Sequence, residues 1–173
     1  MWAVIDLQFS PSFETRREQI QMQNLEAGGE LQSENERSMW HGSSYAAVKS
    51  IVANGFNRSL CGKKGVAYGK GSYFAQNASY VGVAHPDESS LTLFLLSRYS
   101  VKDYTPVHEG KMYVTRCRVL VGMTTLGTSD MVEPPARKDN PEFRFDSTSD
   151  RNGTVVVVYK DDQAIVDYVV EFA

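Results

Sequence analysis

The sequence predicts a single domain of the α+β class, with helices early in the chain and strands late. Two observations support this class. The capped, helix-like segments fall before Phe56, whereas the longest apolar and β-branched runs fall after Gly110. The regular alternation of strands and helices that a parallel sheet requires does not occur. A chain of 173 residues can build its own core, so we expect residues 1–173 to form one domain.

The N-terminal third begins with an apolar run, Trp2–Phe9, that predicts a strand. Ser10–Pro11 is typical of a helix start, because the proline fixes a helical φ and needs no N–H partner there. We expect the helix to cover Phe13–Leu25 and to end at Gly28–Gly29. Glu30–Arg37 is highly charged and predicts a connector at the surface.

The middle of the chain predicts a second helix between two short strands. Met39–Ser43 is an apolar run that meets a glycine, which indicates the end of a strand. Ser44 is placed to cap the following helix, and Asn54–Gly55 is typical of a helix C-terminus. Phe56–Gly71 contains several glycines and predicts a loop, and Ser72–Ala75 predicts a brief strand.

The C-terminal third is rich in strands. Lys111–Val121 predicts a long central strand that stops at a glycine. Thr128–Asn152 contains three prolines and predicts a loop. Thr154–Tyr159 is almost wholly apolar and β-branched, as in a strand buried on both faces. Asp161–Asp162 then turns the chain into a last strand, Val166–Phe172.

Composition narrows the class of protein. The 18 basic and 21 acidic residues give a net charge of −3, and no basic stripe suggests a surface for nucleic acid. Cys61 and Cys117 each stand alone, which argues against a zinc site and leaves a disulfide open. The N-terminus lacks the pattern of a signal peptide, and no apolar run is long enough to cross a bilayer. We expect a soluble domain without a metal that works in the reducing cytoplasm, the nucleus or both.

Among the three histidines, His41 is the candidate for chemistry. It stands at the end of a predicted strand beside Gly42, where a glycine lets a ligand or another backbone approach closely. A structural role for this histidine remains the alternative. His85 and His108 lie in polar loops, and we expect both to be solvated.

The glycine-containing loop Gly69–Gly71 is a second candidate for binding. It does not form GxGxxG, and a strand follows instead of a helix, so it is not a dinucleotide-binding phosphate turn. Tyr73, just after it, could stack on a flat ligand or pack in the core. Asp146, Asp161 and Asp162 are expected to be turn residues, and no serine stands on a nucleophile elbow.

Several blocks of sequence nevertheless occur together, in order, from Met39 to the C-terminus. They are His41–Ser43, Gly55–Ser59, Tyr68–Ala75, Arg118–Gly122, Asp146–Ser147, Val155–Tyr159 and Gln163–Phe172. Together they resemble the catalytic domain of the diphtheria-toxin-like ADP-ribosyltransferases, the poly(ADP-ribose) polymerase family. The sequences GFNRS, CGKKG and YGKGSYFA are most similar to the mono-ADP-ribosyltransferase branch that includes the macrodomain-bearing members.

The resemblance implies a split, mostly antiparallel sheet around a cleft that holds NAD⁺ as substrate, with no metal. It assigns His41 to a hydrogen bond with the adenosine ribose hydroxyl. Gly42 would hold the nicotinamide amide through its backbone, for which the absence of a side chain is suitable. Ser43 and Asn57 would line the adenosine side of the cleft, and Tyr73 would stack under the nicotinamide ring.

Val155 is the first departure from the family pattern. It takes the position of a glutamate that, in polymer-forming members, anchors the ribose and activates the elongating hydroxyl. Valine can neither accept a proton nor anchor a hydroxyl, so we expect transfer of single units and no chain elongation.

The second departure is the segment Val81–Tyr99, which separates two blocks that are adjacent in the family. We interpret it as an insertion. The serine that binds the nicotinamide amide and the second stacking tyrosine are then expected at Ser100 and Tyr104, after the insertion.

The predicted function is transfer of ADP-ribose from NAD⁺ to a protein acceptor, with release of nicotinamide. His41 and Tyr73 would form the catalytic site together with the Val155 position. A module that kept the fold without catalysis is the alternative, and the Val81–Tyr99 insertion beside the nicotinamide site is the feature that favours it. We expect a monomeric domain, short at its N-terminus and part of a longer multidomain chain, that contacts protein acceptors and neither nucleic acid nor membrane.

Overall fold

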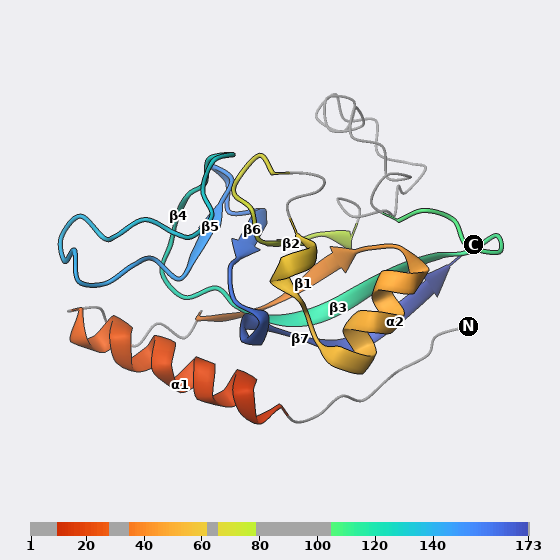
Figure 1. Ribbon diagram of the computed structural model, residues 1–173, viewed down its shortest axis with the longest axis horizontal. Coiled ribbons are helices and arrows are strands. Elements are labelled where there is room, and N and C mark those ends of the chain that lie inside the picture. The colour runs from red at the N-terminus through yellow and green to blue at the C-terminus, as the bar shows by residue number, and fades with distance from the viewer. Residues whose placement is uncertain (1–9, 28–34, 62–65, 79–104, 173) are drawn as a thin grey trace.

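The computed structural model describes residues 10–27, 35–61, 66–78 and 105–172. Within these residues the chain forms a seven-stranded sheet in the order β4-β5-β6-β2-β1-β3-β7 (Figure 1). The strands are β1 (Glu36–Gly42), β2 (Ser72–Ala75), β3 (Met112–Leu120), β4 (Thr124–Leu126), β5 (Ser147–Ser149), β6 (Val155–Val158) and β7 (Ala164–Phe172). The helices are α1 (Pro11–Glu26), α2 (Tyr45–Asn54) and two short 3₁₀ turns, η1 (Arg58–Leu60) and η2 (Asp161–Gln163). Among the described strands only β4 and β5 pair in parallel, so the expected mostly antiparallel α+β fold is confirmed.

The sheet divides between β1 and β2. On one side β1 pairs with β3 along its whole length, from Glu36 opposite Leu120 to Gly42 opposite Val114. On the other side, the described residues give β1 one pairing position with β2, Trp40 opposite Ala75. The two parts of the sheet, β1-β3-β7 and β2-β6-β5-β4, are therefore joined narrowly, which is the split that the resemblance predicted.

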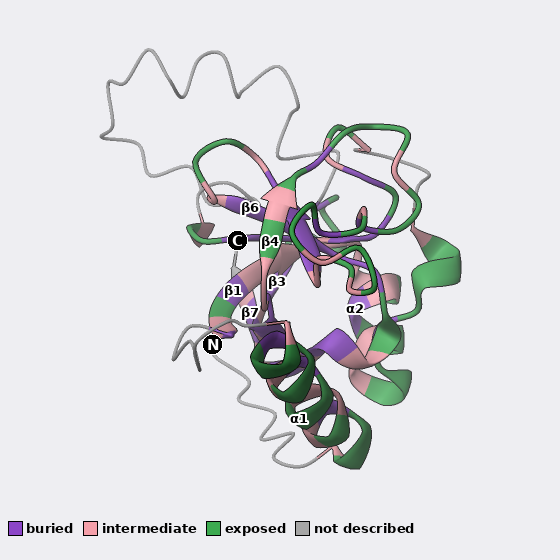
Figure 2. Ribbon diagram, turned by 90° about the vertical axis from the view of Figure 1, so that its left-hand side faces the viewer, coloured by how far each residue is buried: buried purple, intermediate pink, exposed green. Residues whose placement is uncertain are grey.

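The core lies on both sides of β6. Its four valines are each 3% exposed or less, which confirms the prediction of a strand buried on both faces (Figure 2). Full burial of a valine side chain contributes about 1.5–3 kcal/mol. The buried cluster that includes β6 also contains Met39, Phe56, Phe74, Cys117 and Val119, from four other parts of the chain.

The two helices begin and end close to the predicted residues. The Ser44 hydroxyl accepts a hydrogen bond from the Ala47 N–H at 3.3 Å, so it caps α2 as expected. Gly55 ends α2 at a φ of 81°, a left-handed conformation that glycine adopts without strain. Helix α1 packs through Phe13 and Ile20 against Leu120 of β3.

Three expectations about local structure are wrong or incomplete. Glu36 and Arg37 belong to β1 and not to a surface connector, because they pair with β3. β5 forms inside the predicted loop 128–152, and β4 just before it was not predicted. Each of these strands is only three residues long, too short for a periodic pattern to reveal it. The predicted strand Trp2–Phe9 and the glycines expected to end the first helix lie outside the described residues.

Asp146 lies at a bend before β5, as expected for a turn residue, but its burial was not predicted. Its carboxylate is buried and accepts hydrogen bonds from the Met123 N–H at 2.7 Å and from Arg137 at 3.4 Å. Burial raises the pKa of Asp146, and these two partners oppose that change. Asp161 and Asp162 do lie in a turn, η2, as expected.

Gln163 fixes the junction between β6, η2 and β7. Its Oε1 accepts hydrogen bonds from the N–H groups of Tyr159 (3.1 Å) and Lys160 (3.0 Å). Its Nε2 donates to the carbonyls of Asp146 (2.9 Å) and Leu120 (3.3 Å). We expect Gln163→Ala to lower the free energy of unfolding by about 2–4 kcal/mol, because it leaves several buried polar groups without a hydrogen-bond partner. Urea denaturation measures this change.

Gln19→Ala provides the control, since Gln19 is an exposed residue of α1 whose amide contacts Arg16. This variant should stay within about 0.5 kcal/mol of the parent protein. Equal losses from the two variants would show that Gln163 has no special structural role.

Candidate active site

His41 lies at the end of β1, where the sheet divides. Its Nδ1 lies 2.8 Å from the carbonyl oxygen of Tyr73 on β2. A carbonyl can only accept, so Nδ1 carries the proton and donates it. This hydrogen bond links the two parts of the sheet one residue beyond their backbone pairing at Trp40 and Ala75.

Aromatic rings enclose the imidazole of His41. Phe56 contacts it edge-on with ring centres 5.2 Å apart, and Phe74 lies at 5.5 Å. This burial lowers the pKa of His41 below its ordinary value, although the hydrogen bond to Tyr73 opposes the shift. The ring is therefore neutral near pH 7, and Nε2 is left as a hydrogen-bond acceptor.

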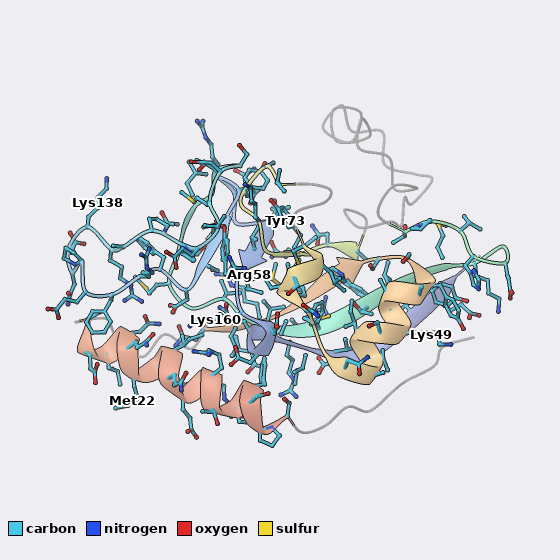
Figure 3. The ribbon with its side chains drawn as sticks, viewed as in Figure 1. Met22, Lys49, Arg58, Tyr73, Lys138 and Lys160 are labelled. Atoms are coloured by element: carbon cyan, nitrogen blue, oxygen red, sulfur yellow. The ribbon has the colours of Figure 1, made fainter. Side chains whose placement is uncertain are left out.

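Tyr73 faces away from the core residue Phe74, because successive side chains of a strand alternate. Its hydroxyl accepts a hydrogen bond from the Tyr68 N–H at 2.9 Å and donates one to the Gly69 carbonyl at 2.8 Å. Tyr73 (labelled in Figure 3) is half-buried, which argues against an ordinary core tyrosine and leaves stacking on a flat ligand as a prediction. Its orientation is set by the backbone bend just before β2.

The structure places three further predicted site residues near His41 in the chain or in space. Gly42 pairs with Val114 of β3. Among the described strands, β2 pairs with β1 at Trp40 and not at Gly42, so β2 does not occupy the other edge of β1 at this residue. Ser43 follows directly and is partly buried. Asn57 follows Phe56, and its Oδ1 accepts a hydrogen bond from the Ser59 N–H at 2.9 Å.

Val155 begins β6 opposite Ala75 and is 3% exposed. The nearest acidic residue in the chain, Asp150, is engaged in the turn before β6. Its carboxylate accepts hydrogen bonds from the N–H groups of Thr154 (2.7 Å) and Val155 (3.0 Å) and from the Thr154 hydroxyl (2.6 Å). Position 155, to which the sequence resemblance assigns the polymerase glutamate, thus carries a buried valine.

Other predicted residues are placed differently or not at all. Ser100, Tyr104, His85 and the segment 81–99 lie outside the described residues. His108 is partly exposed, as expected for a loop residue, and its ring also stacks on Tyr45 with centres 4.3 Å apart.

Sequence reasoning missed two buried hydroxyl groups beside the bend that holds Tyr73. They belong to Thr148 on β5 and to Tyr159 at the end of β6, and both contact the carbonyl oxygen of Tyr68. The one available signal was that Tyr159 places a hydroxyl at the end of an otherwise apolar run.

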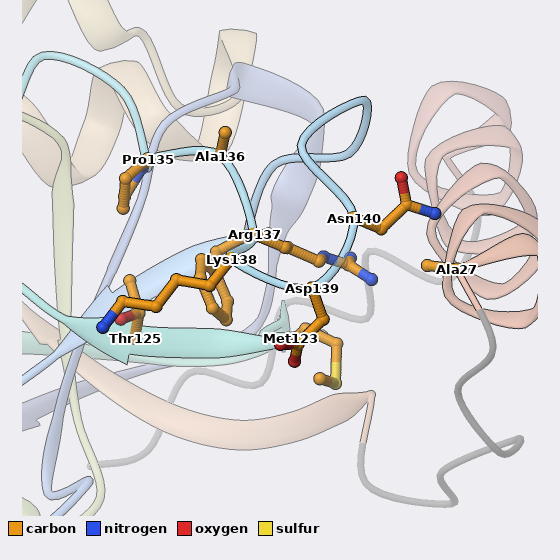
Figure 4. Close-up of a pocket in the computed structure, with 10 residues that line it drawn as sticks. Ala27, Met123, Thr125, Pro135, Ala136, Arg137, Lys138, Asp139 and Asn140 are labelled. Carbon is orange, nitrogen blue, oxygen red and sulfur yellow. The ribbon is translucent and has the colours of Figure 1, made fainter.

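Other features lie away from these residues. A pocket of about 480 Å³ lies between the end of α1 and the loop that follows β4 (Figure 4). Ala27, Met123, Pro135, Arg137 and Phe145 contribute to its wall, and none of the predicted site residues does.

Among the described residues, no group of three His, Cys, Asp or Glu side chains could hold a metal ion. No described helix combines the length and the apolar character needed to cross a membrane. Cys61 and Cys117 are both free thiols, so the disulfide that the sequence left open does not form here. Burial raises the pKa of the Cys117 thiol to about 12.

Comparison with known proteins gives consistent matches. A sequence profile of the poly(ADP-ribose) polymerase catalytic domain matches residues 5–173. Protein mono-ADP-ribosyltransferase PARP14 of Homo sapiens is 34% identical over 144 residues, 82% of this chain and 7% of that protein. Protein mono-ADP-ribosyltransferase PARP10 of Mus musculus is 35% identical over 137 residues, 78% of this chain and 12% of that protein. Protein mono-ADP-ribosyltransferase PARP12 of Mus musculus is 32% identical over 158 residues, 90% of this chain and 19% of that protein. The chain thus spans less than a fifth of each of these relatives.

The lowered pKa of His41 predicts a loss of stability in mild acid. The unfolded chain binds a proton on this histidine more readily than the folded protein does, so folding weakens as pH falls through about 6.5. Between about pH 7.5 and about pH 5.5, we expect the free energy of unfolding of the parent protein to fall more than that of His41→Gln. Urea denaturation at each pH measures the difference.

His108→Gln serves as the control, because it removes a partly exposed histidine and leaves His41 in place. It should keep the pH dependence of the parent protein. If His41→Gln keeps it as well, His41 is not the group responsible.

Proposed function

The chain belongs to the poly(ADP-ribose) polymerase catalytic-domain family, and from this premise we propose that it is a mono-ADP-ribosyltransferase. It transfers one ADP-ribose unit from NAD⁺ to a protein acceptor and releases nicotinamide. The single observation that carries the proposal is the His41–Tyr73 hydrogen bond at the division of the sheet. It joins the His41 side chain to the backbone of Tyr73, so the two residues that the sequence resemblance assigns to opposite ends of the NAD⁺ site lie next to each other.

The geometry suits a reaction that needs positioning more than acid or base catalysis. Nicotinamide in NAD⁺ is already a cationic leaving group, so its departure leaves an oxocarbenium-like ribose. Holding the substrate in a reactive orientation supplies much of the rate. Neutral His41 offers Nε2 to a donor such as a ribose hydroxyl, and the Gly42 backbone can reach an amide without a side chain in the way.

Val155 supports the transfer of single units. A buried valine gives no group that could anchor or deprotonate a ribose hydroxyl for chain growth. An acceptor carboxylate supplies its own negative charge and can attack the sugar from the face opposite nicotinamide. We therefore propose that the enzyme transfers a single ADP-ribose unit to a protein and does not extend it into a chain.

The similarity to proteins named as mono-ADP-ribosyltransferases favours this enzyme over the non-catalytic module considered above. Ser100 and Tyr104 stay predictions for the nicotinamide contacts. Protein acceptors, a longer multidomain chain and a cytoplasmic or nuclear location also belong to the proposal.

Incubation of the chain with labelled NAD⁺ and acceptor proteins tests the function. We expect labelled acceptors with sharp gel mobility, because each site receives one unit. His41→Ala should lose the label, with circular dichroism as the check that the variant is still folded. A smear of long products would contradict single-unit transfer, and a folded parent protein that gives no label would contradict the function.

Tyr73 can be tested by binding alone. Tyr73→Ala should weaken NAD⁺ binding by about 1–3 kcal/mol, because an aromatic face that stacks on a base is lost. Tyr73→Phe keeps the ring and should lose less. Calorimetric titration measures both, with circular dichroism as the check on folding. Unchanged affinity in a folded Tyr73→Ala variant would remove Tyr73 from the site.

A further inference from the structure

The backbone bend Tyr68–Gly71 leads directly into β2 and is held by hydroxyl groups from distant parts of the chain. The carbonyl oxygen of Tyr68 lies 2.7 Å from the Thr148 hydroxyl and 3.2 Å from the Tyr159 hydroxyl. These two hydroxyls lie 2.7 Å from each other. Thr148 is fully buried and Tyr159 is 3% exposed, so the group is removed from solvent.

Close packing around this group leaves the bend little freedom. A β-carbon at Gly69 would overlap the Tyr159 hydroxyl, and one at Gly127 would overlap the Tyr68 carbonyl. Gly69 also has a φ of 129°, which side-chain-bearing residues rarely adopt. Both positions therefore require glycine, because any side chain there would collide with the Tyr159 hydroxyl or with the Tyr68 carbonyl.

The same bend holds Tyr73 from its other side. The Tyr73 hydroxyl bonds the N–H of Tyr68 and the carbonyl of Gly69, while the Tyr73 carbonyl accepts from His41. A continuous series of hydrogen bonds thus runs from Thr148 and Tyr159, through the bend, to Tyr73 and His41. A shift of the Tyr68 carbonyl would move the ring of Tyr73.

The ring of Tyr159 also contacts the segment on the opposite side of the site. The Arg58 guanidinium lies over it, 5.9 Å from the ring centre, and Arg58 follows Asn57 directly. The Arg58 N–H in turn donates to Asp161 in η2. Tyr159 therefore stands between the bend that orients Tyr73 and the segment that carries Asn57.

We propose that Thr148 and Tyr159 are positioning residues for the NAD⁺ site: their paired hydroxyls hold the Tyr68 carbonyl and thereby keep Tyr73 oriented to receive the nicotinamide ring. The inference rests on the proposed function for its effect on catalysis. The two residues act through the bend and do not touch substrate. Because either hydroxyl alone can still bond the carbonyl, their loss is more than additive.

Thr148→Val and Tyr159→Phe remove one hydroxyl each and keep the side-chain shape. We expect each variant to raise the KM for NAD⁺ by roughly two- to tenfold, the factor that one neutral hydrogen bond provides, with a smaller change in kcat. In the double variant, the KM for NAD⁺ should rise by more than the product of the two single-variant factors. Thr148→Ser, which restores the hydroxyl, should recover most of the loss.

Ser147→Ala is the matched control. It removes a fully buried hydroxyl of the same strand, β5, which donates to the Val121 carbonyl at 2.7 Å and does not contact the bend. It should lower stability by a similar amount while the KM for NAD⁺ stays at the parent value. If Ser147→Ala raises KM as much as Thr148→Val, or if neither hydroxyl variant raises it, the positioning role is wrong.

Hydrogen exchange separates this inference from the proposed function, because it needs neither NAD⁺ nor activity. The amide of Tyr68 should exchange at least about tenfold faster in the double variant than in the parent protein, and should stay unchanged in Ser147→Ala. If the parent protein transfers no ADP-ribose, the proposed function fails. Hydrogen exchange still tests whether the Thr148 and Tyr159 hydroxyls hold the bend. Unchanged exchange in a folded double variant would overturn the inference, as would faster exchange without any change of KM in an active enzyme.

Discussion

The candidate site depends on one hydrogen bond, from His41 Nδ1 to the Tyr73 carbonyl, at the place where β1 and β2 part. Separating two strands of a sheet leaves backbone groups that must find other partners. Here a side chain replaces the missing backbone pairing, so the sheet can open without losing its connection. The same bond fixes the tautomer of the imidazole and leaves Nε2 as a hydrogen-bond acceptor. A contact that holds the sheet together thus also prepares His41 to bind a hydrogen-bond donor.

Elsewhere in the described residues, several buried polar groups are held by more than one hydrogen-bond partner. The Tyr68 carbonyl has two hydroxyls, and Gln163 joins four backbone groups where β6 meets η2 and β7. Asp146 combines a backbone N–H with Arg137. Buried polar groups cost free energy when they lack partners, so such networks permit few alternative arrangements. This rigidity suits a site whose chemistry requires orientation.

Val155 is the residue on which the proposal of single-unit transfer rests. It occupies the first position of a strand of four buried valines. The nearest carboxylate in the chain, Asp150, is held by three hydrogen bonds within its own turn. In the proposed function, the negative charge for the attack on the sugar would therefore come from the acceptor.

The sequence by itself determined the features that arise from neighbouring residues. A capping serine and a C-terminal glycine placed α2, a run of valines placed β6, and ordered motifs identified the family and the pair His41 and Tyr73. Tertiary structure alone decided which nitrogen of His41 carries a proton, that Asp146 is buried, and that β4 and β5 exist. It also brought Thr148 and Tyr159 to a carbonyl 80 and 91 residues away in the chain. Propensity and periodicity act over a few residues, whereas such contacts exist only after the sheet has assembled, so no local pattern encodes them.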